Sequence, residues 1–476
     1  MTRVVILGAG PAGVGAAYRI HRGRLGRATV LERSEALGGA AGSFENKGIW
    51  CDFGSHRLHP SVDPEILREL RELLGDDLRL RERRGRIRLR GRWLSFPLRP
   101  WELDRGFLLG VALDLARQAL RGPTEGQAGG DSRRPGIARS ADTFESVVRD
   151  GLGDTIADEF YLPYARKIWG LEAERLSGAQ ARRRISARTP EKLARRLLSP
   201  GGRDRYFYPR RGFGQLTSAL AVAAQALGAQ LRTSMEVTRA RPPLTPHEPW
   251  RLEVTGPSGV EAHEADVVLS TIPASRLIGV LEPKPPAEVL AAAAELSFRA
   301  MVLVYLEVPV DRLSSVDAHY FPEANVRFAR VSEPKNYFGA TEPPGRTILC
   351  AELPCEVGDE TWRATDSALG AWVVADLAQV GMPLPCPAAS VVTKRLRAAY
   401  PICAVGYESA LETVMRYLQS QPRLLSFGRQ GLFAHDNTHH ALLMAYRAVD
   451  CIEDGGLDRA AWERCLAGFQ AHVVED

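Results

Sequence analysis

Three glycines near the amino terminus, Gly8, Gly10 and Gly13, have the spacing of a turn that binds phosphate. They follow the apolar residues 4–7, which predict a buried parallel strand, and they open residues 14–20, which predict a helix. In such a turn the first glycine permits the sharp bend, the second lets a pyrophosphate approach the backbone, and the third lets helix and strand pack closely. The first amide groups of the helix then face the anion. The spacing therefore predicts a dinucleotide site.

A carboxylate at the end of the second predicted strand supports this interpretation. Glu32 ends the strand in "ATVLERS", 19 residues after Gly13. At that position a carboxylate accepts hydrogen bonds from both ribose hydroxyls and repels a 2'-phosphate. The competing interpretation is an ordinary strand, turn and helix with an exposed glutamate.

Three separated segments have the pattern of one nucleotide-binding domain. Besides the amino-terminal unit, residues 212–240 predict a helix, a glycine stop and a strand, and residues 265–273 predict a buried strand that ends in a turn. Residues 424–449 add a final strand, glycine turn and helix. We therefore expect an α/β, Rossmann-type domain assembled from the discontinuous segments 1–75, 203–280 and 405–476.

The intervening segments predict a second, α+β domain formed by residues 76–202 and 281–404. Alternating apolar residues at 301–308 and 346–353 indicate an antiparallel sheet, and helical patterns dominate up to about residue 198. Residues 121–142 are rich in glycine, proline, serine and charge, which predicts a mobile loop.

Composition narrows the class of protein. A chain of 476 residues with 45% hydrophobic and 25% charged residues is typical of a globular protein of two or three domains. The net charge of +5 is uneven, because residues 79–93 and 166–211 are dense in arginine. This density favours an anionic substrate or an acidic surface, with solvated arginine faces as the alternative. No aromatic-interleaved module or zinc spacing supports nucleic acid as a partner.

The cysteines and the apolar stretches indicate the cellular compartment of the protein and whether it crosses a membrane. Seven scattered cysteines predict reduced thiols in the cytoplasm rather than a disulfide framework, and no metal site is expected. The chain enters its first strand at once, which predicts no signal peptide. Residues 107–116 are too short to span a bilayer and contain Asp114. They favour a helix packed on the core, with a membrane-touching helix as the alternative.

Longer stretches make the nucleotide assignment more specific. Besides Gly8 to Gly13 with Glu32, these are "LGGAAGSFENKGIWCDFGSHRLHP", "DEFYLPYARKIWGLEAERLS", "YFYPRRGFGQLTSAL" and "FGRQGLFAHDNTHHAL". In this order they resemble the superfamily of flavin-dependent amine oxidases and protoporphyrinogen oxidases, in the branch near UDP-galactopyranose mutase. The resemblance spans nearly the whole chain and implies a glutathione-reductase-like domain that binds FAD non-covalently.

The resemblance also implies positions along the cofactor. The pyrophosphate would lie at Gly8, Gly10, Pro11, Ala12 and Gly13, the adenosine ribose at Glu32 and Arg33, adenine at Val237, and the passage to the flavin at Gly38 and Gly39. The isoalloxazine would lie by Gly54, Ser55, His56 and Arg57 and by the closing motif of Gly428, Arg429, Asp436, Asn437 and His440. The positive end of the last helix would then stabilise negative charge on the reduced flavin.

Substrate-facing candidates come from both domains. The expected catalytic residues are His56, Arg57, Arg299, Arg330 and Tyr337, and further candidates are His59, Tyr164, Lys167, Trp169, Lys335, His435, His439 and His440. Arg299 and Arg330 stand out because they lie in strand-like segments and because a guanidinium fork suits phosphate or carboxylate. The alternative is that both arginines pair with acids such as Glu295 or Glu333. His439 and His440 are a poor metal pair, because adjacent helical positions face different directions.

Two reaction classes are compatible with these residues. In the first, which we favour, the protein is an oxidoreductase in which a small, anionic substrate gives a hydride to flavin N5 and an acceptor reoxidises the cofactor. In the second, reduced FAD acts through N5 as a nucleophile on an activated sugar, as in the mutase branch. The arginines favour a phosphorylated or carboxylated substrate, but the diphosphate-clamping arginines and tyrosines of the mutases have no clear match. A flavin-binding scaffold without turnover is a third alternative.

Overall fold

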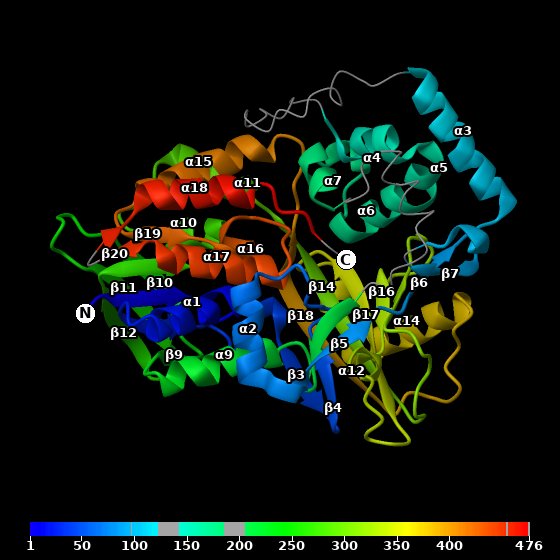
Figure 1. Ribbon diagram of the computed structural model, residues 1–476, viewed down its shortest axis with the longest axis horizontal. Helices are drawn as coiled ribbons and strands as arrows, with labels where there is room; N and C mark the ends of the chain where they lie inside the picture. Colours follow the sequence, from blue (N-terminus) through cyan, green and yellow to red (C-terminus); the bar gives the residue numbers. More distant parts are fainter. Residues whose placement is uncertain (97, 122–141, 185–204, 454–455, 475–476) are drawn as a thin grey trace. The chain divides into compact units, whose positions relative to one another are not determined.

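The computed structural model describes residues 1–96, 98–121, 142–184, 205–453 and 456–474 (Figure 1). The chain divides into two compact units, described separately below. The first unit comprises Met1–Arg81, Arg205–Ser297 and Tyr407–Asp476, and the second comprises Glu82–Asp204 and Phe298–Gly406. Of the predicted mobile loop at 121–142, residues 122–141 lie outside the described residues.

The boundaries of the units differ from the expected segments by more than two residues at two places. Residues 76–81 belong to the first unit because β5 (Leu78–Glu82) pairs with β8 (Arg205–Pro209). Residues 281–297 belong there too, because α11 (Ala287–Glu295) packs against α15 (Tyr407–Ser420). Both connections join segments far apart in the sequence.

A five-stranded parallel sheet forms the centre of the first unit. Its order is β19, β13, β1, β2, β9, and every pair of neighbours is parallel. The strands are β1 (Arg3–Leu7), β2 (Arg27–Leu31), β9 (Gln230–Arg232), β13 (Val267–Ser270) and β19 (Leu424–Ser426). The predicted Rossmann-type domain from discontinuous segments is confirmed.

Three long helices pack together in the first unit. Both α9 (Gln215–Ala226) and α17 (Thr438–Asp450) contact α1 (Pro11–Arg22). Gly15 permits the approach of α17, because a Cβ there would lie 2.9 Å from Leu442 Cδ2. The other helices are α2 (Pro64–Leu74), α10 (Ala274–Val280), α16 (Gly428–Gly431) and α18 (Arg459–Phe469). The small sheets contain β3 (Ser43–Asn46), β4 (Ile49–Asp52), β10 (Glu236–Arg241), β11 (Trp250–Gly256), β12 (Gly259–Ala265), β20 (Ile452–Glu453) and β21 (Gly456–Leu457).

A seven-stranded sheet forms the second unit. In order across the sheet the strands are β18 (Ser390–Pro401), β14 (Phe298–Val308), β17 (Thr347–Cys355), β16 (Arg330–Ser332), β15 (Ala318–Tyr320), β6 (Gly85–Leu89) and β7 (Arg92–Phe96). All neighbours are antiparallel except β15 and β6. The antiparallel pairing predicted for residues 301–308 and 346–353 is confirmed.

Helices cover this sheet through two hydrophobic clusters. One cluster joins Ile87 and Leu94 of the sheet to Phe144 and Trp169 of the helical region, and the other packs α14 (Asp366–Gln379) against β14. The other helices are α3 (Arg105–Arg121), α4 (Phe144–Leu152), α5 (Asp154–Ile156), α6 (Leu162–Trp169), α7 (Gly178–Arg184), α12 (Pro334–Phe338) and α13 (Glu360–Arg363). Within the described ranges, no helix combines the length and the hydropathy needed to cross a bilayer. Each of the seven cysteines is a free thiol.

Candidate functional site

The glycine turn after β1 leaves an opening at the amino-terminal end of α1. Gly8 has φ +96°, and its N–H donates to Leu31 O at 2.8 Å. A Cβ on Gly13 would lie 1.9 Å from Gly8 O, so the crossing of strand and helix requires a glycine. At Gly10, by contrast, a Cβ would have only Gly38 O within 4 Å, at 4.0 Å. Gly10 therefore faces open space.

The start of α1 suits a bound anion. Gly10 is the N-cap, Pro11 follows at the first helical position, and the first turn has no acidic residue. The dipole of this 12-residue helix favours negative charge at its beginning. A second glycine pair adjoins the turn, because Gly38 N–H donates to Ala9 O at 2.9 Å and a Cβ on Gly39 would lie 3.2 Å from Gly10 Cα.

Glu32 is fixed against this turn. Its carboxylate accepts from Ala9 N–H and from Ser34 N–H, both at 2.8 Å, and the residue is 8% exposed. A carboxylate offers about four lone-pair sites, so two backbone donors leave acceptor capacity for hydroxyl groups. Glu32 O also accepts from Met235 N–H at 2.7 Å, which places the start of β10 and the nearby, buried Val237 next to β2. Arg33 is exposed.

The carboxy-terminal motif comes close to the same turn. Gly428 has φ +76° and begins α16, and a Cβ there would lie 3.0 Å from the Cβ of Ala12. Arg429 Nη1 lies 3.5 Å from Asp436 O, so its side chain reaches toward the segment before α17. Residues more than 400 positions apart in the sequence thus adjoin the beginning of α1.

The segment from Gly54 to Arg57 follows β4, which ends at the buried acid Asp52. Gly54 N–H donates to Asp52 O at 2.8 Å. His56 Nε2 lies 2.9 Å from Phe53 O and therefore carries the proton, and its ring stacks on Phe213 at 5.3 Å. Ser55 Oγ lies 3.5 Å from Arg57 Nη1, and the Arg57 guanidinium lies 5.2 Å from the centre of the Tyr206 ring.

Asp52 is the buried acid of this segment. Its carboxylate accepts from Ser43 Oγ at 2.6 Å, Tyr208 Oη at 2.5 Å and Phe213 N–H at 2.7 Å. Burial raises the pKa of Asp52 to about 6, although these hydrogen bonds lower it. The protonated carboxyl is therefore favoured in the fold over the unfolded chain.

This burial predicts a pH effect on stability. Because the folded-state pKa of Asp52 exceeds the ordinary value of 3.8, its contribution to stability is lost as pH rises from about 4 to about 6. Asp52→Asn removes this ionisation. As pH rises across that interval, we therefore expect the free energy of unfolding of the variant to increase by on the order of 3 kcal/mol relative to that of the wild type. Urea unfolding of both proteins at pH 4 and pH 7 measures this change. If the difference in unfolding free energy between variant and wild type is the same at both pH values, the raised pKa of Asp52 is refuted.

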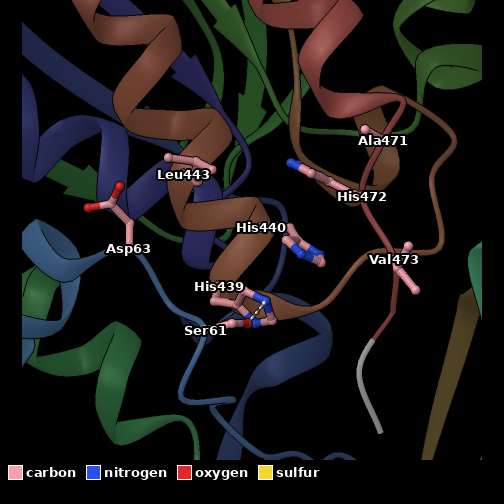
Figure 2. A pocket seen from close by; sticks show the side chains of 8 residues that line it. All are labelled: Ser61, Asp63, His439, His440, Leu443, Ala471, His472 and Val473. Carbon is pink, nitrogen blue, oxygen red and sulfur yellow. Dashed lines mark hydrogen bonds between the residues drawn. The ribbon is translucent and has the colours of Figure 1, made fainter. Parts of the chain in front are cut away.

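A cluster of histidines lies at the start of α17 (Figure 2). Asp436 is buried and its Oδ2 lies 3.1 Å from Nδ1 of His472, whose ring stacks on His440. Asn437 is the N-cap of α17, and its N–H donates to His440 Nδ1 at 3.4 Å. A cavity of about 370 Å³ adjoins the cluster and is lined by Ser61, Asp63, His439, His440, Leu443, Ala471, His472 and Val473.

The sequence raised two expectations about this histidine cluster: the direction of its side chains and the absence of a metal. The rings of His439 and His440 were expected to face apart, but their centres lie 4.0 Å apart, because both side chains turn toward the same cavity. Asp436, His440 and His472 offer donor atoms within 4.8 Å of one another. The two imidazoles are nearly parallel, at 13°, so their in-plane lone pairs do not converge on one point. We therefore assign no metal to the cluster.

In the second unit, Arg330 lies in a row of polar side chains across three strands. Tyr320 of β15 and Glu352 of β17 are its register partners on either side. Arg330 Nε and Nη2 donate to the two carboxylate oxygens of Glu352 at 2.8 and 2.7 Å. The Arg330 side chain is only 14% exposed. Burial tends to lower the pKa of Arg330, but Glu352, Tyr400 and Tyr320 raise it, so the guanidinium stays charged.

Tyr164 belongs to the same group. It interacts electrostatically with Arg330, Tyr320 and Tyr400, and burial raises its pKa, so its hydroxyl stays protonated. The sequence analysis missed Tyr320, Tyr400 and Glu352. The strand register reveals Tyr320 and Glu352, and the electrostatic interaction with Arg330 reveals Tyr400; each lies at least ten residues from Arg330 along the chain.

Other candidates in the second unit have structural contacts. Lys167 Nζ donates to the carbonyls of Phe321, Glu323 and Phe328, and burial lowers its pKa to about 8. Lys335 Nζ donates to the carbonyls of Asp311, Pro343 and Arg346. Trp169 packs in the core beside Phe144, and Tyr337 is 2% exposed in α12. Arg299 Nη1 pairs with Glu356 at 3.1 Å and lies against Gly170.

Two further candidates lie in the first unit. His59 Nδ1 accepts from Ser61 N–H at 3.1 Å, and His435 is buried.

Comparison with known proteins identifies the family. The family model for flavin-containing amine oxidoreductases matches residues 11–452. The chain belongs to the flavin-containing amine oxidoreductase family. It is therefore a flavin enzyme, and its cofactor is FAD. The suspected superfamily is confirmed, as is the predicted cofactor.

Several solved structures have the same fold. A reduced UDP-galactopyranose mutase matches with a TM-score of 0.76 at 21% identity, over 94% of this chain and 93% of the mutase. A protein from Exiguobacterium sp. 255-15 that is named as a protoporphyrinogen oxidase matches with a TM-score of 0.69 at 20% identity, over 94% and 98% of the two chains. A putrescine oxidase bound to putrescine matches with a TM-score of 0.62 at 16% identity, over 94% and 98%.

The first unit of this flavin-containing amine oxidoreductase fits its cofactor. Gly10 leaves space at the start of α1, where the helix dipole favours a pyrophosphate. Glu32 has acceptor sites beyond those used by Ala9 and Ser34. The space at Gly10, the helix start and the Glu32 carboxylate on one turn thus fit an adenosine diphosphate group.

Proposed function

We propose that the protein is an FAD-dependent oxidoreductase that removes a hydride from a small anionic substrate. When bound, FAD supplies a hydride acceptor at N5. The single observation that supports an anionic substrate is the charged Arg330 among three tyrosines in the second unit. An acceptor of unidentified chemistry would reoxidise the cofactor.

In this proposal the first unit is the FAD-binding domain. The pyrophosphate is held at Gly8, Gly10, Pro11, Ala12 and Gly13, and the adenosine by Glu32, Arg33 and Val237. Gly38 and Gly39 line the passage to the flavin. The flavin is held by Gly54, Ser55, His56, Arg57, Gly428, Arg429, Asp436, Asn437 and His440. The contacts of Asp436 and His440 with His472 and Asn437 support an indirect role for both side chains, in which they position the start of α17. The backbone of that helix then supplies the positive dipole end.

The second unit is the substrate domain in this proposal. Glu352 takes two of the donor directions of Arg330 and holds the guanidinium plane in place. Nη1 is then the guanidinium nitrogen left to meet a substrate anion, and the protonated hydroxyl of Tyr164 is a second donor. Hydride loss from an alcohol or amine also releases a proton. His56 is our candidate base, because an imidazole is the side chain that most often serves as a general base near neutral pH.

Matched pairs of compounds test the proposal. Oxidised, FAD-loaded enzyme is mixed without oxygen with phosphorylated or carboxylated alcohols and amines, and separately with the dephosphorylated or esterified form of each compound. We expect an anionic member to bleach the visible flavin absorbance, and its neutral counterpart to do so with an efficiency reduced about tenfold or more. Equal or better bleaching by the neutral forms would overturn the anionic assignment and favour an apolar substrate.

A further inference from the structure

The solvent-facing side of α3 in the second unit is apolar. Leu109 is 62% exposed and Leu113, one turn later, is 49% exposed. Ala112 and Ala116 are also exposed on this side of the helix, and Leu108 lies at its edge. An exposed helix normally turns charged and polar residues to water, so this face is unusual.

The opposite side of α3 fixes this orientation. Phe107 and Val111 are buried in the hydrophobic cluster of the helical region. Asp114 is 5% exposed and accepts from Thr155 N–H at 2.8 Å. A Cβ on Gly110 would lie 2.6 Å from Thr155 Oγ1, so helix and neighbour pack closely. Rotation of α3 cannot bury Leu109 and Leu113 without exposing this buried side.

The residues just before α3 extend the apolar surface. Trp101 is 72% exposed, and the guanidinium of Arg99 lies 5.8 Å from the centre of its ring. Together with Leu108, Leu109 and Leu113, Trp101 forms a set that we call the α3 surface. These four residues fall within 13 positions of the chain, whereas the other large exposed apolar residues of the described ranges are scattered.

The charge around the α3 surface is positive. Arg99, Arg105 and Arg117 are exposed, and Arg117 Nη1 lies 3.6 Å from Oδ1 of Asp114, three residues earlier in the helix. The acids nearby are engaged elsewhere. Glu102 accepts from the Ser95 backbone and hydroxyl, and Asp104 caps Phe107 N–H and pairs with Arg90. Positive charge therefore borders an apolar surface.

We propose that the α3 surface binds the interface of a membrane that contains anionic lipids. A helix with an apolar face bordered by arginine and tryptophan is typical of segments that lie in the plane of the headgroups. The 17 residues of α3 span about 25 Å, enough to lay Leu109 and Leu113 on the bilayer surface. The bordering arginines would meet lipid phosphates with their stems along the acyl boundary. A protein partner is less well supported, because the exposed apolar residues lie on one side of a single helix and arginines border them.

Vesicle sedimentation of the full-length, FAD-loaded protein tests the proposal. We expect the protein to pellet with vesicles of equal parts phosphatidylcholine and phosphatidylglycerol, and to pellet less with phosphatidylcholine alone or at high salt. The double variant Leu109→Glu/Leu113→Glu should lower partitioning about tenfold or more. Val222→Glu on α9 is the matched control, because Val222 is 67% exposed in the first unit. Arg99→Gln/Arg105→Gln should reduce the preference for anionic vesicles.

Other outcomes would overturn the proposal. The proposal is wrong if wild-type protein stays in the supernatant with anionic vesicles. It is also wrong if the double variant and the Val222→Glu control both pellet like the wild type. If the wild type binds no vesicles and elutes as a dimer that the double variant converts to monomer, the α3 surface is an interface between copies of the chain. FAD content and melting temperature of the double variant show that it remains folded.

Discussion

Replacing Gly10 by glutamate is expected to give a folded protein without FAD. The position faces open space at the beginning of α1, so the fold accommodates a side chain there. The new carboxylate would occupy the proposed pyrophosphate site and repel its charge, which we expect to weaken FAD binding by about a hundredfold or more, or about 3 kcal/mol. Flavin absorbance per protein after gel filtration measures the loss, and circular dichroism checks the fold.

Two further glycines are controls for this experiment. Gly279→Glu adds the same charge in the first unit at a position with no atom within 4 Å of the Cβ, so it should retain FAD. Gly13→Ala should lower the melting temperature as well as FAD content, because its Cβ would overlap Gly8 O. A Gly10→Glu protein that retains one FAD per chain would contradict the pyrophosphate assignment.

Removing the charge of Arg330 is expected to destabilise the second unit strongly. Arg330→Met leaves Glu352, which is 2% exposed, without its partner, and breaking a buried pair costs about 3–5 kcal/mol. The double variant Arg330→Met/Glu352→Leu removes both charges and should recover most of this loss. Arg299→Met should cost less than about 1 kcal/mol, because its partner Glu356 is 73% exposed. Urea unfolding of the four proteins measures the series.

The stable double variant also separates structure from substrate binding. If Arg330 binds the substrate anion, the double variant should fold and hold FAD while its KM rises about tenfold or more. If Arg330 only pairs with Glu352, the double variant should keep a normal KM. That second result would leave the proposed anion site without its main support.

The dinucleotide turn could be predicted from sequence because its signals are local. The bend at Gly8, the crossing at Gly13 and the carboxylate after β2 each follow from one short stretch and its backbone requirements. The antiparallel sheet could be predicted for a similar reason. Alternating apolar residues along 301–308 and 346–353 are typical of strands, whose successive side chains point to opposite faces of a sheet.

The polar partners of the candidate residues could not be predicted. Arg330 meets Glu352 because β16 and β17 pair in one register, and a shift of one residue would turn Glu352 to the other face of the sheet. The pairing of Asp436 with His472 depends on how the chain after α18 packs. Lys167 was a candidate substrate residue, but its position beside three carbonyls depends on the course of residues 321–328. In each case the tertiary structure determines which groups the side chain contacts.

The mass of the product formed by initially oxidised enzyme tests the proposed oxidation most directly. A substrate found through flavin bleaching is incubated with catalytic enzyme and an electron acceptor, and substrate and product are compared by mass spectrometry. We expect a product lighter by two hydrogen atoms, or the hydrolysed form of that product, with one two-electron acceptor consumed per product. A product of unchanged mass, formed only after dithionite reduction of the enzyme and without consumption of acceptor, would contradict the oxidation and assign the protein to the mutase reaction class.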